Sequence, residues 1–294
     1  MMYRLLSYQS ARGPRGGVMI DGEIYDLESE TGFSSALAAL QSGKPLGQIS
    51  KRSRPIASPR LLAPILDPGN IFCAGANYTD HMQEMSRAQG MSDGPNMKDL
   101  GERPWHFIKT GRSSVVGPGA TVKLPTYSNA VDWEIELVAV IGRCAKNVSA
   151  VTALDYVAGY TVGNDLSARD VMKRTKNPPT EPFHYDWMSH KCFDGSCPLG
   201  PWIASAETVG DPQQLALKLW VGVELMQDSH SSRMIFSVAE QIEMLSSRVT
   251  LQPGDLIMTG TPAGVGMPRK RFLRAGETVK LWIEKIGEFE HHMA

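Results

Sequence analysis

Two glutamates in one predicted strand carry the strongest chemical signal in the sequence. Glu134 and Glu136 lie in the apolar run Val131–Gly142, which is rich in β-branched residues and typical of a buried strand. Strand side chains alternate between faces, so both carboxylates point to the same side, roughly 7 Å apart along the strand. Two unpaired carboxylates are costly to bury, and a divalent cation between them removes that cost.

A third acid extends this pattern. Asp165 ends a second strand-like run, Val157–Asp165, and precedes a loop, which is a suitable place for a ligand. Three carboxylates with no histidine or cysteine among them favour a hard ion such as Mg²⁺ or Mn²⁺. The spacing alone is equally compatible with an exposed edge strand whose glutamates are merely solvated, so both interpretations stay open.

A possible acid–base pair lies earlier in the chain. Thr79–Met85 resembles the first turns of a helix with Thr79 as its N-cap. His81 and Glu84 are three residues apart, so they share a helix face, and a carboxylate that orients an imidazole could activate water. The alternative is an ordinary surface pair. The polar, aperiodic residues 86–104 that follow are typical of a lid or a mobile loop.

A glycine-rich loop and two lysines are further features of the sequence. The glycines of Gly260–Gly266 allow the backbone to approach a ligand and to aim amides at an anion, although a simple glycine-rich turn is the alternative. Lys109 ends a predicted strand that begins at Trp105. Lys191 precedes a segment of turn residues, and taken alone it is better explained as a surface lysine.

Strands are the main elements predicted to position these residues. The 28 glycines and 19 prolines in 294 residues indicate many turns and favour an α+β, mostly β fold. Residues 1–65 are predicted to form a small N-terminal β-rich domain, with an Asp-Gly hairpin over Val18–Leu27 and a helix over Ser34–Leu40. Residues 66–294 are predicted to form the catalytic domain.

Further patterns define the second half of the catalytic domain. Alternation predicts a strand over Leu215–Leu225, and helical periodicity predicts an amphipathic helix over Val238–Leu245. A hairpin over Val279–Phe289 is predicted to close the domain. The two histidines near the C-terminus, His291 and His292, are assigned no role.

Charge and cysteine content exclude several classes of function. Lysine and arginine total 30 against 31 aspartates and glutamates, so no strong field points to nucleic acid or to an anionic membrane. The sequence shows neither a signal peptide nor an apolar run of membrane-spanning length, and the four scattered cysteines are expected to be reduced. We therefore expect a cytoplasmic protein.

Five separated motifs together resemble the fumarylacetoacetate hydrolase superfamily, in the order found in that family, and the resemblance covers roughly residues 61–289. They are Asn-Tyr-x-x-His-x-x-Glu (77–84), Glu-x-Glu (134–136), Asn-Asp-x-Ser-Ala-Arg-Asp (164–170), Lys-x-Phe-Asp…Pro-x-Gly-Pro (191–201) and Thr-Gly-Thr-Pro-x-Gly-Val-Gly (259–266). The resemblance implies a mixed β-roll around the site, a homodimer, and Mg²⁺ or Mn²⁺ as cofactor, with Ca²⁺ in some members.

The resemblance also implies roles for individual residues. The positions that match the family's metal ligands are Glu134, Glu136 and Asp165. His81 and Glu84 match the water-activating pair of the family. The cations that face the substrate are matched by Lys191, Arg169 and Lys109. Thr261 matches the threonine that binds the substrate carboxylate.

Two positions near the site mark the branch of the family. Asp80 matches a further ligand of the branch that cleaves fumarylacetoacetate itself, but the His81–Glu84 pair resembles the acylpyruvate branch. Met172 stands where that branch has a glutamine that contacts substrate. The irregular segment Lys173–Ser189, which is expected to form one wall of the pocket, is longer than in compact members of the family.

The expected reaction is hydrolysis of a C–C bond in a 2,4-dioxo acid through a metal-stabilised enolate. A small 2-oxoacid is thus the expected partner. The main alternative is decarboxylation of an oxaloacetate-like acid, which needs the enolate but no attacking water. Isomerase, tautomerase or hydratase activity on ring-cleavage products comes next. A non-catalytic metal-binding module is the alternative from another class, but it has no use for His81, Lys191 and the glycine loop together.

Overall fold

The computed structural model describes residues 3–44 and 53–294, and its architecture is mostly β. The larger sheet is mixed and contains eleven strands in the described residues. In spatial order they are β3 (Glu23–Asp26), β2 (Gly13–Ile20), β1 (Arg4–Ser10), β13 (Cys197–Ser205), β11 (Val157–Asn164), β10 (Ile135–Ile141), β16 (Leu256–Met258), β5 (Ile71–Ala74) and β6 (His106–Lys109), with β4 (Leu61–Leu62) beside β1 and β7 (Val115–Val116) beside β13.

A second sheet packs against the first. Its spatial order is β15 (Glu224–His230), β14 (Ala216–Val221), β17 (Thr278–Ile283), β18 (Gly287–Met293) and β8 (Thr121–Val122), and a small ribbon pairs β12 (Ser167–Ala168) with β9 (Val131–Asp132). Ile135 and Leu137 of β10 share one core cluster with Leu217 of β14 and Leu281 of β17. Glu136 and Val138 therefore point to the opposite face of β10.

Helices are short in the described part of the chain. They are α1 (Leu27–Thr31), α2 (Ala36–Gln41), α3 (Thr79–Ala88), α4 (Trp187–Lys191), α5 (Ala206–Val209) and α6 (Val238–Arg248). Single 3₁₀ turns cover Ala153–Tyr156, Arg169–Val171, Pro182–His184, Ser231–Arg233 and Met267–Arg269. Across the described residues, no helix is both long and apolar enough to span a bilayer.

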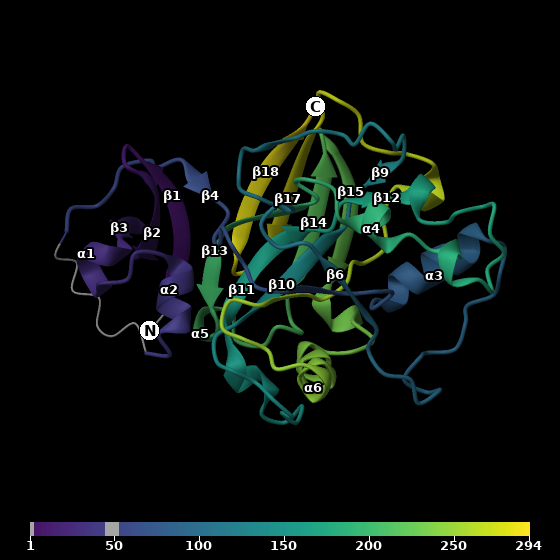
Figure 1. The fold of residues 1–294 in the computed structure, drawn as a ribbon, viewed down its shortest axis with the longest axis horizontal. Helices are drawn as coiled ribbons and strands as arrows, with labels where there is room; N and C mark the ends of the chain where they lie inside the picture. The colour runs from purple at the N-terminus through teal and green to yellow at the C-terminus, as the bar shows by residue number, and fades with distance from the viewer. Residues whose placement is uncertain (1–2, 45–52) are drawn as a thin grey trace.

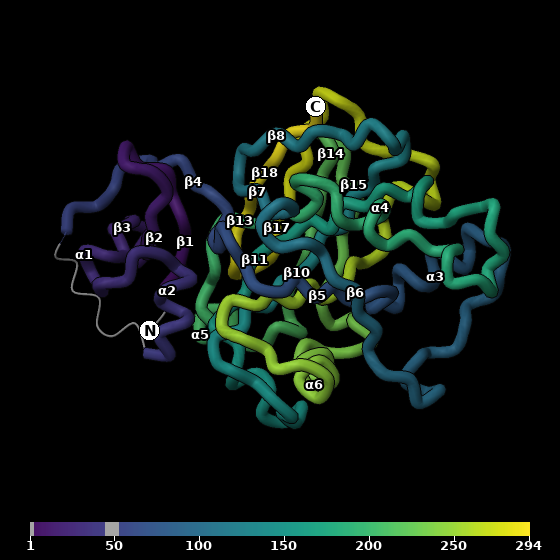
Figure 2. The backbone as a smooth tube through the Cα atoms, viewed as in Figure 1, coloured from purple at the N-terminus to yellow at the C-terminus, as the bar shows by residue number. Residues whose placement is uncertain are grey.

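The N-terminal residues form a lobe beside the main body (Figure 1). Its strands nevertheless continue the large sheet, because Leu5 of β1 pairs with Ile203 of β13. Leu5 and Val18 also share a core cluster with Val138 of the main body. The N-terminal strands thus belong to the same hydrogen-bonded sheet as the main body, and the domain boundary at residue 65 stays a prediction. At the opposite end of the molecule lie α3 and the loop that follows it (Figure 2).

Several predicted elements are confirmed. The hairpin of β2 and β3 turns at Asp21-Gly22, whose φ values are 50° and 83°, the left-handed conformation that an Asp-Gly turn favours. The helices expected near residues 34–40 and 238–245 form as α2 and α6. Ser237 and Glu240 make a capping box at the start of α6.

Other predictions were wrong in detail. Thr79 is not the N-cap of α3: Tyr78 holds that position, and the Thr79 hydroxyl donates to the carbonyl of Arg233. The strand predicted to reach Leu225 ends at Val221. A short turn follows, and a separate strand, β15, begins at Glu224. The segment Lys173–Ser189, predicted to be irregular, ends in a helix, because α4 begins at Trp187. The closing hairpin is longer than expected and includes both terminal histidines in β18.

Candidate active site

Three acids form a buried cluster. The carboxylates of Glu134, Glu136 and Asp165 each offer an oxygen within 4.8 Å of the other two. Glu136 lies on β10, Asp165 directly follows β11, and Glu134 lies in the connection between β9 and β10. The amide of Asp165 donates to the carbonyl of Glu134 at 2.9 Å, which fixes two of the three residues to each other.

The strand predicted over Val131–Gly142 is broken at this cluster. The ladder stops after Asp132 and resumes at Ile135, so Glu134 sits in the gap. The prediction of one continuous strand was therefore wrong, although both glutamates still reach the same cluster. At the break, the backbone N–H groups of Glu134 and Ile135 donate to the side-chain oxygens of Asn164 and Gln227 and not to backbone carbonyls.

The donor set fits a divalent metal ion. One oxygen of Glu136 accepts the amide N–H of Gly260 at 2.8 Å, and the other is buried without a hydrogen-bond partner among the described residues. Burial, then Asp165 and Glu134, raise the pKa of Glu136 well above its usual value. A cation at the cluster would bind the unpartnered oxygen and keep the carboxylate ionised.

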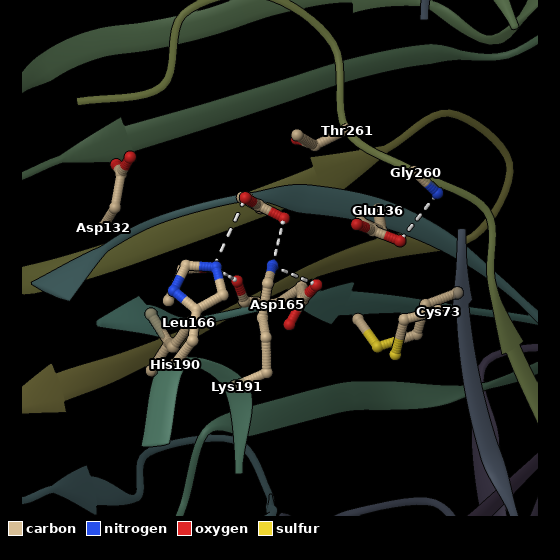
Figure 3. A network of polar contacts seen from close by, with 12 residues as sticks. Cys73, Asp132, Glu136, Asp165, Leu166, His190, Lys191, Gly260 and Thr261 are labelled. Atoms are coloured by element: carbon tan, nitrogen blue, oxygen red, sulfur yellow. Dashed lines mark hydrogen bonds and ion pairs between the residues drawn. The ribbon is translucent and has the colours of Figure 1, made fainter. Parts of the chain in front are cut away.

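Two buried lysines touch the acids directly. Lys191 donates to Glu134 at 3.0 Å and to Asp165 at 2.7 Å, and Lys109 donates to Asp165 at 2.7 Å. Figure 3 shows the Lys191 ammonium aimed at Asp165 and the amide of Gly260 at Glu136. Burial opposes the charge of Lys191, but Asp165 and Glu134 outweigh burial and raise the pKa of its ammonium. Lys191 is therefore a buried cation of the site.

Arg169 is a third cation of the site, beside Lys109 and Lys191. Its guanidinium donates to Asp132 at 2.9 Å and forms an ion pair with Glu134. Asp132 is fully buried and also accepts the amide of Gly266 at 2.6 Å. Asp132 thus orients Arg169 and anchors the end of the glycine loop. The sequence offered one signal for this role, namely an acid two residues before the Glu-x-Glu motif.

A cavity of about 190 Å³ opens onto the cluster. Its polar wall consists of His81, Glu134, Arg169, Lys191 and Thr261, and His190 and the backbone at Gly75 and Ala76 complete it. The structure therefore brings these five predicted residues together at one cavity. Lys109 and Glu136 do not line this cavity, and Lys109 reaches the site through Asp165.

The rest of the cavity lining is mainly apolar. Trp187 packs against Trp105 and Phe107, with ring centroids 5.1 and 5.5 Å away. Lys191 lies over the Phe107 ring at 4.9 Å, so this aromatic wall directly contacts the buried cation. Met172 also lines the cavity, so a thioether stands where the acylpyruvate branch has its amide.

The predicted pair on α3 does not hydrogen-bond in this structure. Glu84 accepts the amide N–H of Gly264 at 2.8 Å, whereas Nδ1 of His81 is buried with no partner among the described residues. Burial lowers the pKa of His81 to about 4, so its imidazole is neutral near pH 7. The glycine loop, not His81, therefore holds the Glu84 carboxylate. The amides of this loop, which were expected to face an anion, bind carboxylates of the protein itself.

Asp80 and Thr261 are also held by neighbours. Asp80 accepts from the Ser229 hydroxyl at 2.6 Å and is not part of the three-acid cluster in the described chain. The hydroxyl of Thr261 donates to the carbonyl of Ile135 at 2.9 Å and accepts from the Gln227 amide at 2.9 Å. Gln227 carried no signal in the sequence, because it follows the predicted strand Leu215–Leu225 and its own strand, β15, does not alternate between buried and exposed residues.

Fold and site define a family of enzymes. The sequence profile described as fumarylacetoacetate (FAA) hydrolase, C-terminal, matches residues 70–294. The chain belongs to the fumarylacetoacetate hydrolase family. The predicted mixed β-roll is confirmed, because a fumarylacetoacetate hydrolase from Exiguobacterium antarcticum superimposes with a TM-score of 0.84, at 30% identity, covering 100% of this chain and 99% of the other.

More particular relatives differ in the reaction their names give. The oxaloacetate tautomerase fahd2 of Xenopus laevis, named as mitochondrial, is 36% identical and covers 97% of this chain and 88% of the relative. A fumarylpyruvate hydrolase from Pseudomonas aeruginosa, in complex with Mn²⁺ and pyruvate, has a TM-score of 0.65 at 32% identity, covering 77% of this chain and 90% of the other.

Proposed function

We propose that this chain is a divalent-metal-dependent enzyme that interconverts the keto and enol forms of a small 2-oxo dicarboxylic acid such as oxaloacetate, with Mg²⁺ or Mn²⁺ as its metal. One observation carries the proposal: the neutral imidazole of His81 lines the same cavity as Glu134 and Lys191, while the Glu84 carboxylate is engaged elsewhere. The similarity to oxaloacetate tautomerases over most of the chain supports it.

The residues of the cavity suit this proton transfer. A bound divalent ion, held by the three acids, would polarise the 2-ketone and acidify the neighbouring C–H. Lys191 and Arg169 place positive charge beside the position where negative charge develops on the ketone oxygen. His81 is the group we assign to receiving the proton from C3, and protonation of the oxygen then gives the enol.

Hydrolysis of a C–C bond in a 2,4-dioxo acid is the second candidate. His81 and Glu84 lie one turn apart on α3, as a water-activating pair requires, and the fumarylpyruvate hydrolase neighbour supports this reaction. Hydrolysis would require Glu84 to leave the amide of Gly264 and to orient His81. Decarboxylation of oxaloacetate needs neither the water nor this rearrangement.

A substrate panel separates these reactions. Wild-type protein saturated with Mg²⁺ or Mn²⁺ is assayed for loss of enol absorbance from oxaloacetate, for pyruvate release from oxaloacetate, and for cleavage of acylpyruvates and fumarylpyruvate. We expect metal-dependent tautomerisation to have the highest kcat/KM, and a chelator to abolish it. Efficient acylpyruvate cleavage without tautomerisation would replace the proposal by the hydrolase.

A further inference from the structure

The break at Glu134 is held by one side chain from the neighbouring strand β11 and one from β15 of the second sheet. The backbone N–H of Glu134 donates to the side-chain oxygen of Asn164 at 2.9 Å. The next N–H, that of Ile135, donates to the side-chain oxygen of Gln227 at 2.9 Å. Two consecutive buried donors therefore take side-chain amides as partners where a strand neighbour would normally serve. The backbone that carries a candidate metal ligand depends on the placement of these two amides.

The orientation of the Asn164 amide follows from this contact. A backbone N–H can only donate, so the oxygen of Asn164 faces Glu134 and its NH₂ group faces away. The nitrogen of that NH₂ group lies 2.9 Å from Nε2 of His291. Nε2 must therefore accept the hydrogen bond, and His291 is the neutral tautomer with its proton on Nδ1. His291 is fully buried, and burial lowers its pKa to about 3, in agreement with the neutral form.

The second sheet supports the break through two residues. His291 lies on β18 and Gln227 on β15, whereas Asn164 lies on β11 of the large sheet and Glu134 directly precedes β10. Gln227 also donates to Thr261 at 2.9 Å, so it joins the broken strand to the glycine loop. The five-stranded sheet thereby fixes the edge of the carboxylate cluster through two side-chain amides.

We propose that His291 is a positioning residue that sets the metal affinity of the three-acid cluster, acting through Asn164 on the backbone of Glu134. Loss of its acceptor nitrogen leaves a buried donor of Asn164 unpaired, so the amide rotates or moves, and the Glu134 carboxylate moves with its backbone. Partners behind metal ligands typically change metal affinity about 10- to 100-fold. This inference rests on the metal dependence in the proposed function and is independent of which reaction is catalysed.

A matched pair of variants tests the acceptor. Glutamine and methionine have similar size and shape, but only His291→Gln offers an oxygen that can accept from Asn164. His292→Met is the control, because its imidazole instead faces the Thr278 hydroxyl, 2.9 Å away. Mn²⁺ affinity is measured without substrate, from the electron paramagnetic resonance signal of free Mn²⁺, and circular dichroism confirms that each variant is folded.

The expected order of affinity separates positioning from a general packing role. Wild type and His292→Met should bind Mn²⁺ equally, His291→Met about 10- to 100-fold more weakly, and His291→Gln close to wild type. Equal binding by His291→Met, or equal weakness of the Gln and Met variants, overturns the inference. Wild-type protein that binds no Mn²⁺ would instead refute the metal dependence on which the inference rests.

A measurement on the wild type covers the case in which His291→Met does not fold. The ¹⁵N resonance of His291 Nε2 should show the neutral tautomer and should shift when Mg²⁺ is added, whereas that of His292 should stay in place. An unchanged His291 resonance at saturating Mg²⁺ would contradict the coupling between this histidine and the metal centre.

Discussion

The two halves of the site are held in different ways. The carboxylate cluster is built on buried strands: Glu136 is 1% exposed, and Lys109 and Lys191 bind Asp165 from two sides. By contrast, α3 carries the buried imidazole of His81, but every residue of this helix is at least partly exposed, and residues 89–103 after it are exposed apart from the half-buried Met97. The difference suggests a division of labour, in which a rigid sheet binds the metal and a movable segment delivers the proton-transfer group.

The largest effect should come from a substitution in the carboxylate cluster, which is the half of the site built on buried strands. Glu136→Gln keeps the acceptor for the amide of Gly260 but removes the negative charge that a cation needs. We expect this variant to fold, to lose measurable Mn²⁺ binding and to lose turnover, as chelation of the wild type should. Isothermal titration with Mn²⁺ checks it, and retained affinity would remove Glu136 from the ligand set.

Removal of the buried cation should have the next largest effect. Lys191→Met takes one charged donor from the site, and loss of such a donor typically lowers kcat by about 10²- to 10³-fold, or roughly 3 kcal/mol. Metal should still bind, because the three acids remain. Steady-state kinetics with saturating Mn²⁺ gives the answer, and normal turnover would show that Lys191 has only a structural role.

The pH dependence of kcat/KM should report on His81, which lies in the α3 half of the site. Burial lowers the pKa of His81 to about 4, below its ordinary 6.5, so the proton-accepting form persists from neutral pH down to about 4. We therefore expect kcat/KM to fall on the acid side near pH 4, and the contribution of His81 to folding stability to be lost as pH falls from 6.5 through 4. An acid limb near 6.5, or an unchanged limb in His81→Ala, would contradict this assignment.

The smallest effect should be a change in how well ordered residues 79–104 are. Residues 79–104 are expected to act as a lid that becomes ordered over a bound 2-oxoacid analogue. Hydrogen exchange of this segment should slow when oxalate and Mg²⁺ are added, while β10 and β11 stay equally protected. Equal exchange with and without oxalate would leave α3 as a fixed wall and erase the contrast between the two halves.

Local sequence patterns predicted the fold better than they predicted the support of the site. The hairpin at Asp21 and helix α6 follow from short-range signals, and both form. The break at Glu134 could not be predicted, because its two partners lie 30 and 92 residues away in the chain. Similarly, the i,i+3 spacing predicts a contact between Glu84 and His81, but in the structure the Glu84 carboxylate accepts a hydrogen bond from the amide of Gly264, 180 residues away.

One missed residue did have a signal. Phe289, His291 and Met293 alternate with polar residues along β18, and all three are buried. Period-2 alternation alone could have placed His291 on the inner face of a strand. Its position near the C-terminus suggested a tail, and its contact with Asn164, 127 residues away, is visible only in three dimensions.

The central claim is that His81 moves a proton without activating water. The most direct measurement compares oxaloacetate tautomerisation with acylpyruvate cleavage in wild type, His81→Ala and Glu84→Ala, all saturated with metal. We predict that His81→Ala lowers tautomerisation by about 10²- to 10⁴-fold, the usual range for a general acid–base group, while Glu84→Ala lowers it far less because Glu84 binds the glycine loop. If both variants instead lose acylpyruvate cleavage equally and tautomerisation survives in both, the pair activates water and the protein is a hydrolase.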